Sequence, residues 1–147
     1  AGGVAVVLHG YMRFTEDLDL IVLLEEKNLD KLFEALKSIK YMPKVPVTKE
    51  QFIKHENRER WKKEKGMIVF SFVQENPPFH LIDIFVDYPI RFDSLYENKV
   101  DVEANGMTVP IVSVDHLIKI KKKAGRDIDL NDVVQLEGIK GINKQSQ

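Results

Sequence analysis

The sequence predicts a single α+β domain in which helices flank a mixed central β-sheet. The chain has 147 residues, of which 44% are hydrophobic and 31% are charged, and this balance is typical of a globular domain. Apolar segments with strand patterns alternate with segments of helical periodicity. The sequence contains no internal repeat and no second apolar core, so one layered domain is expected.

The N-terminal half begins with a helix, a strand and a second helix. Apolar residues at positions 4–8 predict a short helix that ends at Gly10. Residues 17–24 first alternate and then become continuously apolar, which is typical of a strand whose body is buried. Apolar residues recur at helical spacing over residues 29–39, so a helix that packs on the sheet should follow.

The middle of the chain predicts a charged helix and a hairpin. Residues 43–46 are interpreted as a linker, after which Thr48 and Gln51 offer a capping box for a strongly charged helix that ends near Gly66. Residues 67–73 and 79–86 have strand composition on either side of a proline-containing turn, which favours an antiparallel hairpin.

The C-terminal third predicts another hairpin and two helices. The Asn105-Gly106 pair between two short strands is a strong hairpin signal. Ser113 is expected to cap a helix that ends at Gly125, and residues 129–136 should form a last short helix. The polar tail at residues 142–147 is expected to fray.

Composition excludes several classes of function. No apolar run reaches the roughly 18 residues that span a bilayer, and the first residues lack the basic flank of a secretion signal, so we expect a cytoplasmic protein without membrane contact. The absence of cysteine excludes disulfides, thiolate zinc sites and a cysteine nucleophile. The four histidines lack the spacing of metal ligands, so structural or surface roles are expected for His9, His55, His80 and His116.

Three aspartates are candidate metal ligands. Asp17 and Asp19 are two residues apart, so on a strand both carboxylates point to one face. Asp83 lies inside an apolar strand, where an unpaired charge is costly. If the two strands are neighbours, the three carboxylates form the oxygen-rich site that Mg²⁺ prefers, and two ions about 3.5–4 Å apart could support a phosphoryl transfer.

Each carboxylate also has another interpretation. The pair Asp17 and Asp19 could be an ordinary feature of a strand start, and Asp83 could form a structural salt bridge with Arg91 or Lys121. Asp87 shares the parity of Asp83 and is a rival ligand, although its place at a strand end favours a solvated turn.

Residues near the N-terminus are candidate phosphate contacts. Gly2 and Gly3 open a helix whose free N–H groups could hold a triphosphate, or they could form a plain tight turn. Arg13 and Thr15 could add a guanidinium and a hydroxyl to such a site, and Arg13 could equally be a surface residue.

Together these residues resemble the DNA-polymerase-β-like nucleotidyltransferases. The first 19 residues look like the Gly-Gly or Gly-Ser motif followed by Asp-x-Asp, and Asp83 matches the third carboxylate. The stretch at residues 121–132 resembles small bacterial and archaeal members related to abortive-infection toxins. Such members have a strand directly before the Gly-Gly motif, so further residues are expected upstream of Ala1.

The resemblance implies a fold, an activity and a set of roles. The fold would be the nucleotidyltransferase fold, and the reaction a Mg²⁺-dependent transfer of a nucleoside monophosphate from a triphosphate such as ATP to a hydroxyl of RNA or protein. Mn²⁺ is the alternative ion. The implied roles are two-ion binding by Asp17 and Asp19, catalytic-ion contact and proton acceptance by Asp83, phosphate binding by Gly2 and Gly3, and a place near the nucleotide for Lys121 and Arg126.

Alternatives to these roles remain open in the sequence. Lys121 could instead belong to a solvated basic helix end, and Asp129 and Asp132 could fix Arg126 or cap the last helix. The basic helix at residues 58–65, with Trp61, could dock a nucleic-acid backbone or be a solvated face.

At the level of the whole protein, the alternatives to the transferase are a non-catalytic nucleotide-binding or antitoxin-like partner with the same fold, and a Mg²⁺-dependent phosphodiesterase. Oligomeric state is not predicted.

Overall fold

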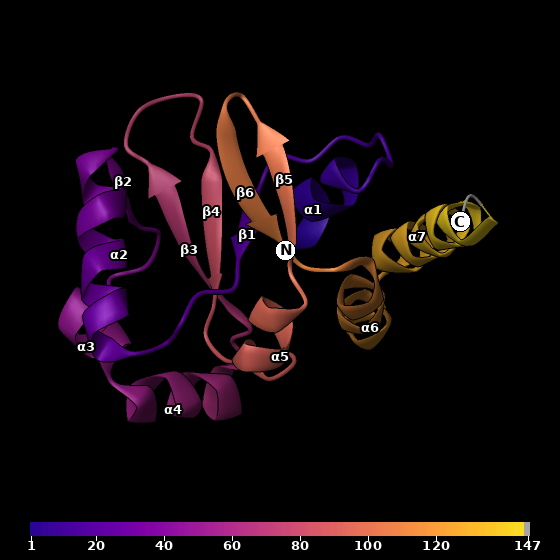
Figure 1. Cartoon of the computed structure of the whole chain (residues 1–147). Helices are drawn as coiled ribbons and strands as arrows, with labels where there is room; N and C mark the ends of the chain where they lie inside the picture. The colour runs from indigo at the N-terminus through magenta and orange to yellow at the C-terminus, as the bar shows by residue number, and fades with distance from the viewer. Residues whose placement is uncertain (146–147) are drawn as a thin grey trace. The chain divides into compact units, whose positions relative to one another are not determined.

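The computed structural model describes residues 1–145 and shows two compact units (Figure 1). The central unit is Glu16–Tyr88, and the terminal unit combines Ala1–Thr15 with the chain from Pro89 onward. The sequence predicts one domain over residues 1–147.

The central unit is built on a four-stranded mixed sheet. Its elements are β1 (Leu18–Leu20), α2 (Glu26–Ser38), β2 (Tyr41–Pro43), α3 (Lys49–Ile53), α4 (His55–Lys65), β3 (Val69–Gln74) and β4 (Leu81–Phe85). The strand order is β1-β4-β3-β2, with β1 parallel to β4 and the other pairs antiparallel. The predicted β3–β4 hairpin is therefore confirmed, whereas β1 is shorter than expected. Strand β2 was not expected, and it overlaps the predicted linker only at Pro43.

One face of this sheet carries the hydrophobic core. Alternate residues of β3 and β4 are buried, which is the pattern of strands covered on that face. Helices α2, α3 and α4 supply the facing side chains. The rings of Phe52 and Phe70 are the nearest aromatic pair, with centroids 4.5 Å apart. The buried cluster comprises Leu29, Phe33, Leu36, Phe52, Trp61, Phe70, Phe72, Ile82, Ile84 and Val86.

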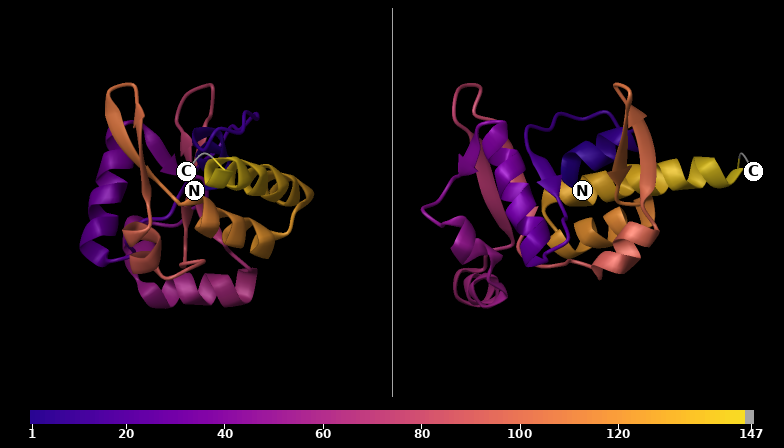
Figure 2. Two further views of the ribbon diagram at one scale, coloured as in Figure 1. Left: turned by 45° about the vertical axis from the view of Figure 1, so that its right-hand side comes forward. Right: turned by 60° about the vertical axis from the view of Figure 1, so that its left-hand side comes forward.

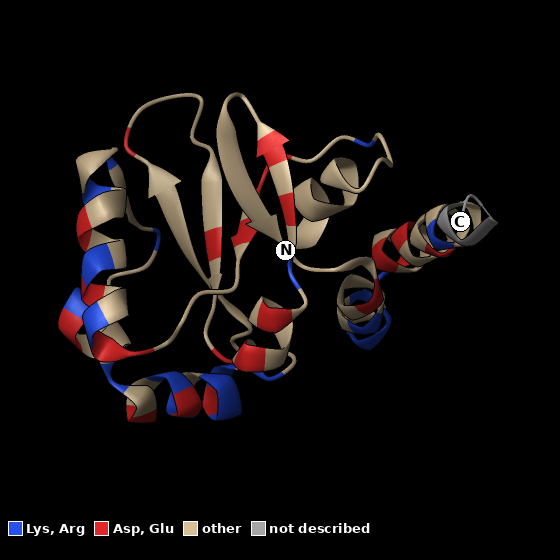
Figure 3. Cartoon of the chain, viewed as in Figure 1, with Lys and Arg blue, Asp and Glu red and all other residues tan. Residues whose placement is uncertain are grey.

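The charged helix of the prediction is two helices separated at Lys54. Thr48 forms the predicted capping box with Gln51 at the start of α3. Lysines on α4 are exposed and visible as blue segments (Figure 3), but Trp61 is buried and stacks on Phe52. A buried indole cannot stack on a nucleotide base, so the nucleic-acid docking considered for Trp61 is wrong.

Arg58 is the buried cation of the central unit. Its side chain donates to the carbonyl oxygens of Phe52 and Ile53 at 2.8 and 2.6 Å and to that of Leu24 at 3.4 Å. Burial lowers the pKa of the guanidinium, and the nearby Tyr88 and Asp87 act in the opposite direction. Arg58 therefore connects α4 to the end of α3 and to the segment after β1. A residue of a solvated helix face would not make these contacts.

We expect Arg58→Lys to destabilise the protein by about 1–2 kcal/mol, because an ammonium cannot reproduce the fork of donors to several carbonyl groups. Arg60→Lys is the matched control, since Arg60 is exposed and donates to the Asn57 side chain; its effect should be within about 0.5 kcal/mol. Urea unfolding of the two variants gives both values, and equal losses would contradict the role of Arg58.

The terminal unit contains four helices and a hairpin within the described residues. Its elements are α1 (Gly2–Leu8), α5 (Phe92–Glu97), β5 (Val100–Ala104), β6 (Met107–Ile111), α6 (Val114–Ala124) and α7 (Asp127–Gln145). The hairpin turns at Asn105 and Gly106, with φ of 50° and 75°, as the predicted two-residue turn requires.

Helices α6 and α7 lie side by side (Figure 2). Ser113 is the N-cap residue of α6, although its side chain makes no capping bond, and Gly125 ends the helix with φ of 68°. Helix α7 is longer than the predicted helix at residues 129–136. The predicted frayed tail overlaps its last turn, and residues 146–147 lie outside the described residues.

Candidate functional site

Two of the three predicted carboxylates occupy matching positions on neighbouring strands. Asp19 of β1 and Asp83 of β4 are register partners in the parallel pair. Aligned residues of paired strands point to the same face of a sheet, and the strands are about 4.8 Å apart. This face is opposite to the one that buries Ile82 and Ile84. The expectation that the two strands are neighbours is therefore confirmed.

Asp17 lies just before β1, two residues from Asp19. Asp17 and Asp19 are half-buried. Among residues 1–145, no three Asp, Glu, His or Cys side chains are gathered in the way that ligands of one ion would be. The three-carboxylate metal site thus stays a prediction, and the aligned pair of Asp19 and Asp83 is its structural basis.

The Asp83 carboxylate has an unsatisfied oxygen. Its Oδ1 atom is buried and has no hydrogen-bond partner in the part of the chain that the structure describes. The two cations considered as salt-bridge partners are paired with other carboxylates, Arg91 with Asp93 and Lys121 with Asp129 and Asp132. A buried carboxylate oxygen without a partner is costly. A cation bound at this position would offset that cost, so the donor chemistry fits Mg²⁺.

Ser71 is a site residue that the sequence reasoning missed. It is the antiparallel register partner of Asp83 on β3, so its side chain shares the face of that carboxylate. The predicted hairpin already indicated that Ser71 and Asp83 are opposite one another, because residues equally distant from a turn pair across the two strands. Ser71 is the polar residue that interrupts the apolar sequence of β3.

Asp87 behaves as a surface ion-pair residue. It accepts a short hydrogen bond from Lys62 of α4. Burial works against ionisation, but the bonds from Lys62 and from the backbone of Tyr88 hold the pKa of Asp87 below its usual range. Asp87 already has a cationic partner, whereas Oδ1 of Asp83 has no hydrogen-bond partner among the described residues, so Asp83 stays the predicted third ligand.

Gly3 lies in close contact with two other predicted phosphate-binding residues. A Cβ atom at Gly3 would be 2.4 Å from Thr15 Oγ1 and 2.6 Å from Arg13 Nη2, which is closer than atoms can approach. Gly2 has φ of 60°, a left-handed conformation that favours glycine. The structure thus brings Gly3, Arg13 and Thr15 together within the terminal unit, and both glycines are required by their local geometry.

Lys121 and Arg126 belong to an ion-pair cluster with two buried aspartates. Lys121 Nζ lies 2.7 Å from Asp132 Oδ2 and 3.1 Å from Asp129 Oδ1. Arg126 Nε donates to Asp129 Oδ2 at 2.6 Å. Asp129 and Asp132 are buried, and Asp129 holds Arg126 as considered from the sequence. Lys121 is only 4% exposed, so its alternative interpretation as part of a solvated helix end is wrong.

The ion pairs of Asp129 predict a specific acid response. Burial raises the pKa of Asp129, but the hydrogen bonds from Arg126 and Lys121 outweigh it, and the pKa lies below its usual value. A lowered folded-state pKa contributes stability above the unfolded value of about 3.9 and loses that contribution as pH falls. We expect Asp129→Asn to flatten the loss of stability between about pH 5 and pH 3. Urea unfolding across this range measures the slope. The exposed Asp127→Asn should keep the wild-type slope, and an equal change in both variants would contradict the prediction.

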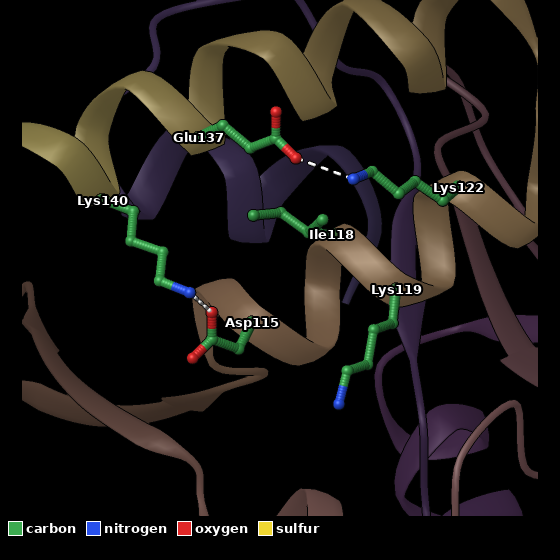
Figure 4. Close-up of a pocket in the computed structure, with 6 residues that line it drawn as sticks. All are labelled: Asp115, Ile118, Lys119, Lys122, Glu137 and Lys140. Carbon is green, nitrogen blue, oxygen red and sulfur yellow. Dashed lines mark hydrogen bonds and ion pairs between the residues drawn. The ribbon is translucent and has the colours of Figure 1, made fainter.

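A surface hollow between α6 and α7 is lined by paired charges (Figure 4). Lys122 and Glu137 lie 2.7 Å apart, and Lys140 pairs with Asp115. Ile118 lies between the two pairs. None of the predicted site residues lines this hollow, so it supplies no argument for a nucleotide site.

Comparison with known proteins supports the fold. No family model and no curated protein matches the chain. Among solved structures, the chain is similar to the crystal structure of the lincosamide antibiotic adenylyltransferase LnuA with lincomycin bound. The TM-score is 0.56 at 16% sequence identity, and the match covers 94% of this chain and 84% of that chain. None of the helices in the described residues has the length and apolar composition needed to cross a membrane. The chain therefore has the α+β fold predicted from its sequence, a mixed sheet flanked by helices like that of a nucleotidyltransferase.

Proposed function

We propose that this protein is a nucleotidyltransferase that moves a nucleoside monophosphate from a triphosphate to an acceptor hydroxyl in the cytoplasm. The observation that carries the proposal is the alignment of Asp19 with Asp83 on parallel strands, together with the unpartnered Oδ1 of Asp83. Two adjacent carboxylates repel one another. A bound cation would offset this repulsion, which supports a nucleotide–metal site at this position.

Mg²⁺ is the proposed cofactor, with Mn²⁺ as the alternative. Asp17, Asp19 and Asp83 would hold it, since hard divalent cations prefer carboxylate oxygens. When bound, two such ions supply charge stabilisation for the reacting phosphate and its leaving group.

The chain's own residues would divide the remaining tasks. Asp83 would accept the proton of the acceptor hydroxyl. At the same time the hydroxyl oxygen would form a bond to the α-phosphorus, and the bond from the α-phosphorus to pyrophosphate would break. Gly2 and Gly3 would bind the β and γ phosphates through backbone N–H groups. Arg13 and Thr15, which contact Gly3, would support this binding. Lys121 and Arg126 are proposed to act near the nucleotide, although both also pair with Asp129.

Three acceptor classes are to be tested. RNA and protein are the acceptors that the resemblance implies. The similar solved structure is an antibiotic adenylyltransferase with lincomycin bound, so a small hydroxylated molecule is the third class. The identity of the acceptor also tests the proposed relationship to abortive-infection toxins. A toxin of this kind would modify a macromolecule of its own cell.

Label transfer tests the proposed activity. The protein is incubated with each of the four nucleoside triphosphates labelled at the α-phosphate, with Mg²⁺ or with EDTA, and with each acceptor class. We expect Mg²⁺-dependent label on one acceptor and release of pyrophosphate. Tight triphosphate binding without transfer to any acceptor would favour the non-catalytic or antitoxin-like partner, and hydrolysis of a phosphodiester without label transfer would favour the phosphodiesterase.

A further inference from the structure

The Gly2–Gly3 segment lies against the side chain of Arg13. Arg13 Nη2 lies 2.6 Å from the position that a Cβ atom of Gly3 would occupy, so the guanidinium rests directly on the Gly3 backbone. The Nη1 atom of Arg13 donates to the carbonyl of Phe14 at 2.9 Å. The guanidinium therefore contacts the Gly3 backbone through Nη2 and the Phe14 carbonyl through Nη1.

Asp132 holds the other side of the same guanidinium. Its Oδ1 lies 3.0 Å from Arg13 Nε, and its side chain is completely buried, whereas that of Arg13 is 16% exposed. Asp132 comes from α7, more than 100 residues away in sequence. A fully buried carboxylate cannot touch a nucleotide, so any effect of Asp132 on nucleotide binding must pass through the residues that it contacts.

Lys121 lies beside the other oxygen of the Asp132 carboxylate. Its Nζ is 2.7 Å from Asp132 Oδ2 and 3.1 Å from Asp129 Oδ1. Arg13 pairs with one oxygen of the Asp132 carboxylate and Lys121 with the other, through charge and without a hydrogen bond to either oxygen among the described residues. The chain of contacts therefore runs from α6 and α7 through Asp132 and Arg13 to the Gly3 backbone.

We propose that Asp132 is a positioning residue, which acts through Arg13 to keep the Gly2–Gly3 segment in the one conformation that binds triphosphate. The nucleotide part of this inference rests on the proposed function. It also revises the part expected of Arg13, which holds the Gly3 backbone in addition to any phosphate contact.

Amide hydrogen exchange of the nucleotide-free protein tests the positioning directly. In Asp132→Asn and in Arg13→Gln, exchange at residues 3–8 should rise by about tenfold or more over wild type, since the segment loses its external support. Arg13→Gln leaves the pair of Asp132 and Lys121 in place, so it remains informative if Asp132→Asn does not fold. Asp115→Asn is the matched control, because it removes another ion pair between α6 and α7 without touching Arg13. Wild-type exchange at residues 3–8 in folded Arg13→Gln would overturn the proposal.

Triphosphate titration of the same variants tests the link to nucleotide binding. Asp132→Asn should weaken binding by about tenfold, and Asp132→Glu should restore part of it. Unchanged affinity in folded Asp132→Asn would overturn the positioning role. If the wild type binds no triphosphate, the proposed function fails, and the exchange measurement still decides whether Asp132 positions the segment.

Discussion

Asp83→Asn is expected to lower the rate of nucleotidyl transfer by about 10³-fold, equivalent to about 4 kcal/mol of transition-state stabilisation. The amide keeps the shape of the side chain but removes the negative charge that would hold the proposed metal and the oxygen that would accept the proton. Stability should stay the same or rise, because the variant removes the repulsion of Asp19 and replaces a charged oxygen that has no hydrogen-bond partner in the described residues. Single-turnover transfer and thermal unfolding measure the two effects.

Asp87→Asn is the control for this variant. Asp87 shares the parity of Asp83 but pairs with Lys62. We expect its transfer rate to remain within about twofold of wild type, since a surface ion pair contributes little. A large loss of transfer rate in Asp87→Asn together with a normal rate in Asp83→Asn would contradict the assignment. Asp87 would then be the third ligand in place of Asp83.

Gly3→Ala is expected to destabilise the protein by about 1–3 kcal/mol and to abolish measurable triphosphate binding. The new methyl group would lie 2.4 Å from Thr15 Oγ1 and 2.9 Å from Thr15 Cβ. The hydroxyl can rotate away, but the Cβ atom is fixed to the backbone, so the segment must shift. Thermal unfolding and calorimetric titration detect the two effects.

Gly138→Ala is the matched control for Gly3→Ala. Gly138 lies in α7 with open space around it and a helical backbone, so alanine should stabilise the protein by about 0.5–1 kcal/mol. Opposite signs for the two variants are the expected result. A neutral Gly3→Ala would show that the close contact with Thr15 does not constrain the segment.

Most of the fold could be predicted because its signals are local. The alternation of apolar residues in β3 and β4, the Thr48 capping box and the Asn105-Gly106 turn each act over a few residues. The sequence could not predict that β1 and β4 are neighbours, because strand order depends on tertiary packing. Their pairing was therefore only assumed when the carboxylate site was predicted. Two elements were missed: β2, whose Pro43 favoured a linker, and α5, which is only six residues long.

The partners of the buried cations could not be predicted for a different reason. Arg58 and Lys121 lie in charged sequences that are typical of solvated helix faces. Their partners are backbone carbonyl groups of another helix for Arg58, and carboxylates of α7 for Lys121. Such partners exist only in the folded chain. Asp83 was singled out because a carboxylate inside an apolar strand is unusual in any tertiary context. Asp19 was singled out because it lies two residues from Asp17.

Calorimetric titration of each nucleoside triphosphate with Mg²⁺ tests the central claim most directly, because it measures the nucleotide–metal site without knowledge of the acceptor. The wild type is compared with Asp17→Asn/Asp19→Asn and with Asp87→Asn, each first shown to be folded. We predict that the wild type and Asp87→Asn bind at least one triphosphate in a Mg²⁺-dependent manner and that the double variant does not. Absence of binding of all four triphosphates to the folded wild type, or equal binding by the double variant, would contradict the account.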